Sequence, residues 1–172
     1  MINNLLKGTL YFVVCVLLQV LIFNNIYFFR MATPFVYLYF IVKLPVGMSR
    51  VKVVFFSFLI GLVIDLFGNT PGMHAAACTL AGFVRHPLIQ FFMGKDLPEG
   101  ITPSFRTFTY GGYFRYVLSL VFVQCAVLFF IESLTLFDPL FLLIRLVASV
   151  VLTVILLMAA EGFNLDIRKS EA

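Results

Sequence analysis

Long apolar runs occupy most of the sequence and constrain its fold more than any other feature. They cover approximately residues 5–24, 31–46, 51–68, 72–93, 114–136 and 139–161. A helix needs about 20 apolar residues to cross the hydrocarbon core of a bilayer. Apolar residues make up 62% of the chain and charged residues only 12%, so a soluble fold could not cover this surface. We therefore expect an all-α integral membrane protein, with residues 1–172 forming a single transmembrane helical domain.

The second apolar segment is the weakest candidate for a transmembrane helix. Pro34 lies near its start and Lys43 near its end, so its uninterrupted apolar part is short for a span. Lys43 could extend to the interface from a helix that is tilted or only partly embedded. The sequence therefore predicts a bundle of six transmembrane helices, or of five if this segment does not cross. Residues 1–23 lack a small-residue cleavage pattern and are expected to form an uncleaved first span.

The distribution of basic residues predicts the orientation of the chain. If all six segments span and both termini lie in the cytoplasm, ten of the 12 basic residues fall on the cytoplasmic side, as the positive-inside rule requires. These ten are Lys7, Lys43, Arg50, Lys52, Arg85, Lys95, Arg106, Arg115, Arg168 and Lys169. If the second segment does not cross and the N-terminus lies outside, Lys7 and Arg30 exchange sides and the split is unchanged. Charge therefore orients the last four spans and leaves the first two open.

The connections between segments have distinct compositions. Residues 66–72 contain glycine, asparagine and proline without a basic residue, which predicts a short outer loop. Residues 94–112 are the longest polar stretch, and we expect them to face the cytoplasm, either as an exposed surface for a soluble partner or as a plain linker. Residues 162–172 are predicted to form a short cytoplasmic tail.

Sequence motifs for catalysis or metal binding are missing. The chain has no His-Glu-x-x-His helix, no Gly-x-Ser-x-Gly turn and no Walker loop. His74 and His86 belong to one segment and would lie about 18 Å apart along a helix, so they cannot share a metal ion. The cysteines are isolated within apolar runs and are expected to pack as small residues. We therefore expect no enzyme activity, no cofactor and no metal site, and the basic residues at segment ends do not indicate nucleic-acid binding.

Asp65 is the acidic residue placed most firmly within an apolar run, and an intramembrane carboxylate is a functional candidate by default. The competing interpretation is that Asp65 holds neighbouring helices together. A rise of 1.5 Å per residue places Asp65 roughly 5 Å and Arg145 roughly 9 Å from the outer ends of their spans, which predicts that the two side chains pair. In the alternative, Arg145 extends to the headgroups and Asp65 accepts hydrogen bonds from Asn69, Thr70 or His74.

The fourth segment contains two further candidates for structural or interaction roles. Arg85 and His86 lie in its inner half, where Arg85 can extend toward the inner headgroups or both residues can mark a polar pocket. Small residues that include Ala76 open the segment, and such residues favour close contact between helices in membranes. That contact is either internal to the bundle or an interface with a partner helix.

Two stretches have patterns that point to a family. Residues 22–50, IFNNIYFFRMATPFVYLYFIVKLPVGMSR, contain a second segment that begins with proline and is rich in aromatic residues. Residues 61–85, GLVIDLFGNTPGMHAAACTLAGFVR, place Gly-Leu-x-x-Asp at the end of the third span, then Pro71 and Gly72 in a loop, then an alanine-rich start of the fourth span. Together they resemble the MreD family of rod shape-determining proteins. Met73 departs from the family pattern, in which an aliphatic residue usually follows the glycine.

The resemblance implies a non-catalytic subunit of the bacterial cell-elongation machinery in the cytoplasmic membrane. Such a subunit binds an MreC-like protein and is linked through it to MreB-like filaments and to peptidoglycan synthases along the side wall. The architecture is also similar to the substrate-binding membrane subunits of energy-coupling-factor vitamin transporters, which makes small-ligand binding the alternative function. That alternative requires a closed polar cavity, for which the available side chains are Gln19, Asp65, Asn69, Thr70, His74 and Gln124.

Overall fold

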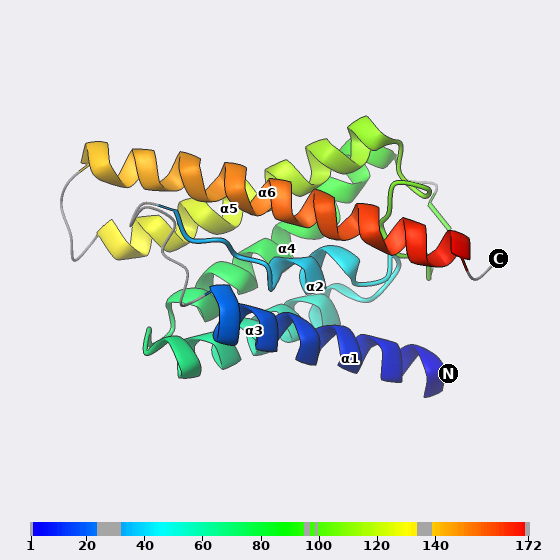
Figure 1. Ribbon diagram of the computed structural model, residues 1–172, viewed down its shortest axis with the longest axis horizontal. Helices are drawn as coiled ribbons and strands as arrows, with labels where there is room; N and C mark the ends of the chain where they lie inside the picture. Colours follow the sequence, from blue (N-terminus) through cyan, green and yellow to red (C-terminus); the bar gives the residue numbers. More distant parts are fainter. Residues whose placement is uncertain (1, 24–31, 95–96, 99, 134–138, 171–172) are drawn as a thin grey trace.

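A computed structural model shows a bundle of helices that run roughly along one axis (Figure 1). The structure describes residues 2–23, 32–94, 97–98, 100–133 and 139–170, with side chains for 10–21, 32–94, 97–98, 100–133 and 140–163. The elements are α1 (Ile2–Leu18), the π-helical turn η1 (Gln19–Phe23), α2 (Leu38–Lys43), α3 (Arg50–Gly68), α4 (Met73–Met93), α5 (Tyr110–Ser133) and α6 (Pro139–Ser170). The described residues contain no β-strand, which confirms the predicted all-α class.

Three helices are long and apolar enough to cross a membrane. They are Arg50–Gly68, Tyr110–Ser133 and Leu140–Phe163, and Leu10–Leu21 is a shorter apolar helix. Large apolar side chains such as Val51, Leu66 and Phe91 are exposed on the outside of the bundle. Apolar surface of this extent is typical of a protein that faces lipid. These features indicate a membrane protein.

The last helix is longer than the sequence predicted. α6 continues to Ser170, so most of the expected tail over residues 162–172 is helical. Gly162 lies inside this helix, where a single glycine costs only about 1 kcal/mol relative to alanine. No proline follows it, and the helix therefore passes the point where the apolar run ends.

The second apolar segment passes through the bundle as extended chain followed by the six-residue helix α2. The backbone N–H of Thr33 donates to Ser149 Oγ at 3.1 Å, and Lys43 contacts Glu161 further along α6. These two positions of α6 are about 18 Å apart at the helical rise. Residues 33–43 therefore run parallel to α6, from one end of the bundle toward the other.

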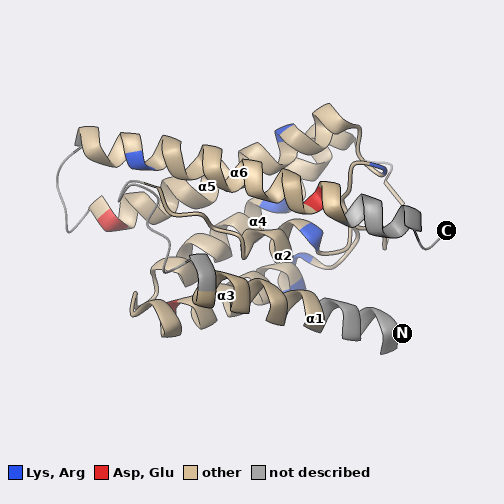
Figure 2. Ribbon diagram, in the orientation of Figure 1, with Lys and Arg blue, Asp and Glu red and all other residues tan. Residues whose placement is uncertain are grey.

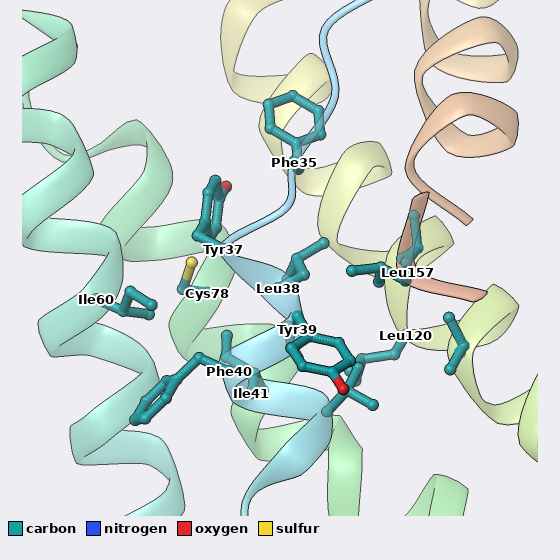
Figure 3. Packing of buried hydrophobic residues seen from close by; sticks show 14 of the residues in the cluster. Phe35, Tyr37, Leu38, Tyr39, Phe40, Ile41, Ile60, Cys78, Leu120 and Leu157 are labelled. Carbon is teal, nitrogen blue, oxygen red and sulfur yellow. The ribbon is translucent and has the colours of Figure 1, made fainter. Parts of the chain in front are cut away.

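α2 lies at the centre of the bundle (Figure 3). Each of residues 35–42 has 8% or less of its surface exposed. Pro34 has no N–H to donate and disfavours the helical conformation of the residue before it, so the helix begins only after it. Non-helical backbone at membrane depth is tolerated where protein surrounds it. The segment is thus neither a full transmembrane helix nor a tilted helix at the interface.

α3 and α4 form a close hairpin built on small residues. A Cβ atom added to Gly61 would lie 2.5 Å from the carbonyl oxygen of His74 and 2.7 Å from Cα of Ala75. Ala75 and Gly82 are buried in the same interface. Of the two alternatives for these small residues, the structure shows contact inside the bundle. Ala76 is exposed and does not take part in it.

The two ends of the bundle differ in charge. The end that contains the start of α1, the finish of α6 and the 97–109 connection is called here the terminal end, and the end with the α3–α4 turn is called the hairpin end (Figure 1). Figure 2 shows most of the described basic residues toward the terminal end. Arg145 is the exception, because it lies in the early turns of α6 near the hairpin end. The predicted positions of Lys7, Arg30, Lys95, Arg168 and Lys169 lie outside the described side chains.

Candidate functional site: a polar interior along the second segment

Polar side chains are buried inside this otherwise apolar bundle, and most of them contact residues 32–44 or the α3–α4 turn. They are Gln19, Ser57, Asp65, Arg85, Ser104, Gln124, Ser149, Thr153 and Glu161. A buried polar group costs free energy unless it forms hydrogen bonds. The partners of these groups therefore show what the polar interior does.

Side chains from α6 and η1 satisfy the extended backbone that precedes α2. Gln19 Nε2 donates to the carbonyl oxygen of Pro34 at 2.9 Å, and its Oε1 accepts from the N–H of Val36 at 2.9 Å. The N–H of Phe35 donates to Thr153 Oγ1 at 3.1 Å. These bonds replace the i to i−4 bonds that a continuous helix would provide. The polar residues thus allow non-helical chain to pass through the core.

A second group surrounds the hydroxyl of Tyr37, which is fully buried. Gln124 Nε2 donates to this hydroxyl at 2.9 Å and also lies 3.7 Å from Cys78 Sγ. The hydroxyl lies 2.8 Å from His74 Nδ1. The Tyr37 hydroxyl oxygen can accept a second hydrogen bond, so the tautomer of His74 decides which of the two groups donates in this contact. Gln124 Oε1 has no hydrogen-bond partner and is the spare acceptor of this group.

Asp65 caps the start of α4 from the end of α3. Its Oδ1 accepts from the backbone N–H of His74 at 3.0 Å and from Thr70 Oγ1 at 2.8 Å, while Oδ2 accepts from the N–H of Ala75 at 2.8 Å. The first N–H groups of a helix lack partners within the helix, and a carboxylate also interacts favourably with the helix dipole. Asp65 therefore joins the end of α3 to the start of α4, as the structural interpretation expected. Two of its three expected donor residues, Thr70 and His74, are correct.

The turn between α3 and α4 requires left-handed backbone at two positions. Asn69 has φ 52° at the end of α3, and Gly72 has φ 84° immediately before α4. Glycine adopts this conformation without a steric penalty. Pro71 and Gly72 are exposed, and Asn69 is exposed beside them. Pro71 and Gly72 are therefore turn residues, and Asn69 does not bond Asp65 through its side chain.

The predicted pair between Asp65 and Arg145 is wrong. Arg145 Nη1 lies 2.6 Å from Glu132 Oε1, with 23% and 19% of the two side chains exposed. The Arg145 guanidinium also lies 5.2 Å from the ring centre of Phe129. The depth estimate matched Asp65 and Arg145 along the bundle axis but could not show which helices are neighbours. α5 lies beside α6 and provides the nearer carboxylate.

An ionic group closes the interior at the terminal end. Lys43 Nζ lies 2.6 Å from Glu161 Oε2 and donates to the carbonyl oxygen of Pro103 at 2.8 Å. The hydroxyls of Tyr39 and Tyr113 donate to the same Glu161 oxygen at 3.1 and 3.4 Å. Lys43 was expected to extend to the interface. Its ammonium group is instead held inside the bundle by a carboxylate from α6.

Arg85 is also buried instead of reaching outward. It is 3% exposed, and its Nη2 donates to the carbonyl oxygen of Leu44, just after α2. Its Nε and the hydroxyl of nearby Tyr116 have no hydrogen-bond partner. His86 is partly exposed and lines a cavity together with Arg85. Of the two interpretations of Arg85 and His86, the structure supports the polar pocket.

Sequence reasoning missed several residues of this interior. Glu132 and Glu161 lie near the ends of apolar segments, and no prediction paired them with basic residues. Thr153 is an isolated polar residue within an apolar run, and an isolated polar residue at membrane depth is the signal that could have pointed to it. Gln19 was expected only as a side chain for a ligand cavity, and it instead bonds the backbone of Pro34 and Val36. The sequence could not show which residues on other segments contact these polar side chains.

The described hydrogen bonds of this interior join segments of the chain to one another. Among the described residues, no group of three or more His, Cys, Asp or Glu side chains could hold a metal ion. Most of the buried polar groups bond to backbone or to each other. Comparison of the chain with protein-family models, curated proteins and solved structures gives no match.

Proposed function

We propose that this chain is a non-catalytic membrane subunit of the bacterial cell-elongation machinery. In this proposal it lies in the cytoplasmic membrane and binds an MreC-like protein, which links it to MreB-like filaments and peptidoglycan synthases. The motivation is the resemblance of residues 22–50 and 61–85 to the MreD family. The observation that carries the proposal is that residues of the matching pattern have roles in building one hairpin. Gly61 and Ala75 meet at the helix contact, Asp65 caps α4, and Gly72 provides the left-handed turn.

The proposal includes six crossings of the membrane with both termini in the cytoplasm. α1 with η1, residues 32–43, α3, α4, α5 and α6 are the crossings. The second crossing, residues 32–43, passes through the interior of the bundle. Other helices separate it from the lipid, because residues 35–42 are buried. The gathering of basic residues toward the terminal end supports a cytoplasmic location for that end (Figure 2).

The hydrogen-bond partners of the buried polar side chains favour a subunit role over ligand transport. A ligand-binding interior needs donors and acceptors directed at the ligand. Gln19 bonds the backbone of Pro34 and Val36, and Asp65 bonds α4. Gln124 and His74 both bond Tyr37, although Gln124 retains one free acceptor. Most of the polar groups available for a ligand are thus already used within the chain.

Depletion of the protein from a rod-shaped host bacterium tests the proposal. We expect the cells to become round, and the tagged chain in detergent to copurify with a single-span MreC-like protein. A variant such as Val147→Leu, a conservative change at an exposed position of α6, is the control and should restore rod shape on re-expression. Normal shape after depletion, together with saturable binding of a vitamin-like ligand by the purified chain, would contradict the proposal and support the transporter alternative.

A further inference from the structure

A cavity of about 170 Å³ lies between α3 and α4 near the terminal end. Its volume is roughly ten times the minimum that one water molecule requires. The wall is formed by the loop before α3, the first turn of α3, the second half of α4 and the segment that follows it. The charged and polar side chains of the wall are Arg50, Arg85, His86 and Gln90. Among the described residues, the lining contains no acidic side chain.

Arg85 is the basic residue of this cavity that is buried, and its positive charge therefore needs a partner. A guanidinium group carries five N–H donors, and a buried charge is costly unless it is paired. In the described structure Arg85 is 3% exposed, its Nη2 donates to a backbone carbonyl, and its Nε has no partner. None of the carboxylates that the structure describes forms an ion pair with it, in contrast to Lys43 and Arg145. An anion in the cavity would provide the missing negative charge.

The backbone at the cavity also favours an anion. α3 begins at Arg50, and Ser49 before it provides no side-chain hydrogen bond to the first turn. The first N–H groups of a helix are unsatisfied within the helix and attract negative charge. Arg50 and the start of α3 face the cavity together with Arg85 from α4.

We propose that this cavity binds a phosphate group. Arginine side chains recognise phosphate oxygens through parallel N–H donors, and Arg50 and Arg85 approach the cavity from two helices. His86 adds a ring N–H donor. The phosphate can come from the headgroup of an anionic lipid at the membrane surface or from a soluble phosphate compound. The proposal requires the membrane location of the bundle and is independent of a role in cell elongation.

Native mass spectrometry of the purified chain in detergent tests the proposal with two probes, phosphatidylglycerol and inorganic phosphate. We expect one saturable phosphate-containing adduct, weakened about tenfold by Arg50→Gln and by His86→Leu, since each removes a donor to a charged ligand. Lys52→Gln removes the same charge two positions from Arg50, outside the cavity lining, and should change the affinity less than twofold. Size-exclusion chromatography and circular dichroism check that each variant is folded.

The two probes separate the sources of phosphate. An adduct with phosphatidylglycerol that an excess of inorganic phosphate does not displace identifies a lipid headgroup. Saturable binding of inorganic phosphate that also displaces the lipid identifies a soluble phosphate compound. The proposal is overturned if neither probe gives a saturable adduct, or if Lys52→Gln weakens binding as much as Arg50→Gln, because binding would then follow general surface charge.

Discussion

Lys43 Nζ lies 2.6 Å from Glu161 Oε2, and the two side chains are 10% and 2% exposed. This ion pair joins the end of α2 to α6, two segments separated by most of the sequence. Lys43 also lies 5.6 Å from the ring centre of Tyr39, whose hydroxyl donates to the same carboxylate. The second segment is thereby fixed inside the bundle at the end where it leaves the core.

Removal of one partner of this pair is expected to be more harmful than removal of both. Glu161→Ala leaves the Lys43 ammonium buried without a counterion, and the free energy of unfolding should fall by about 3 to 5 kcal/mol. The double variant Lys43→Met with Glu161→Ala should recover part of the loss. Unfolding in mixed detergent micelles, followed by circular dichroism, measures the two single variants and the double variant. Strictly additive losses would show that the two groups do not interact.

Thr153→Val tests the support of the extended backbone. The change keeps the side-chain shape but leaves the buried N–H of Phe35 without an acceptor, so the free energy of unfolding should fall by about 1 to 3 kcal/mol. Thr79→Val is the matched control, because Thr79 Oγ1 bonds only the carbonyl oxygen of Ala75 one turn earlier in its own helix. The control should change stability by less than about 0.5 kcal/mol. Equal effects of the two changes would contradict a special role for Thr153.

The partners of Asp65 and Arg145 predict a specific pattern of additivity. Asp65→Ala removes three hydrogen bonds to a carboxylate and should lower the free energy of unfolding by about 3 kcal/mol. Its effect should add to that of Arg145→Ala, because the two residues have no shared partner. Glu132→Ala and Arg145→Ala should be non-additive by about 1 kcal/mol, since this pair is partly exposed. Coupling of Asp65 with Arg145 in the same double-mutant cycle would contradict the observed pairing.

Gly61→Ala tests the close contact between α3 and α4. The added methyl group would meet the backbone of His74, so the helices must separate, and the expected loss of stability is about 1 to 3 kcal/mol. Gly162→Ala provides the control, because a Cβ atom there meets nothing within 4 Å. Alanine is the better helix former, so this control should keep or slightly raise the thermal unfolding temperature. A rise in both variants would mean that the hairpin is looser than the structure shows.

The apolar segments and their order could be predicted from the sequence because hydrophobic runs report directly on burial in lipid. α3, α5 and α6 agree with the runs that predicted them, apart from the C-terminal extension of α6. The role of Asp65 could be partly predicted, because its donors lie within ten residues of it and local spacing limits their positions.

The neighbours of residues far apart in the chain could not be predicted from one sequence. Lys43 and Arg145 each pair with a glutamate on another helix, and depth along the axis leaves the rotation and order of helices undetermined. The neighbours of the second apolar segment could not be predicted for the same reason. Pro34 and Lys43 indicated an irregular crossing, but the stabilising groups Gln19 and Thr153 lie on other elements.

The proposed arrangement of six crossings with both termini in the cytoplasm is tested most directly by cysteine labelling in intact cells. The native cysteines are buried, and they are replaced by alanine before single cysteines are introduced. The exposed positions Ser49, Asn69 and Thr109 serve as probes, because Ser104 is only 8% exposed and would react poorly on either side.

A membrane-impermeant maleimide added outside should modify the cysteine at Asn69 and leave those at Ser49 and Thr109 unmodified until the cells are permeabilised. A cysteine at Asn3 decides the contested first two crossings. Six crossings predict that it reacts only after permeabilisation, whereas ready reaction in intact cells would place the N-terminus outside and contradict the passage of residues 32–43 through the membrane.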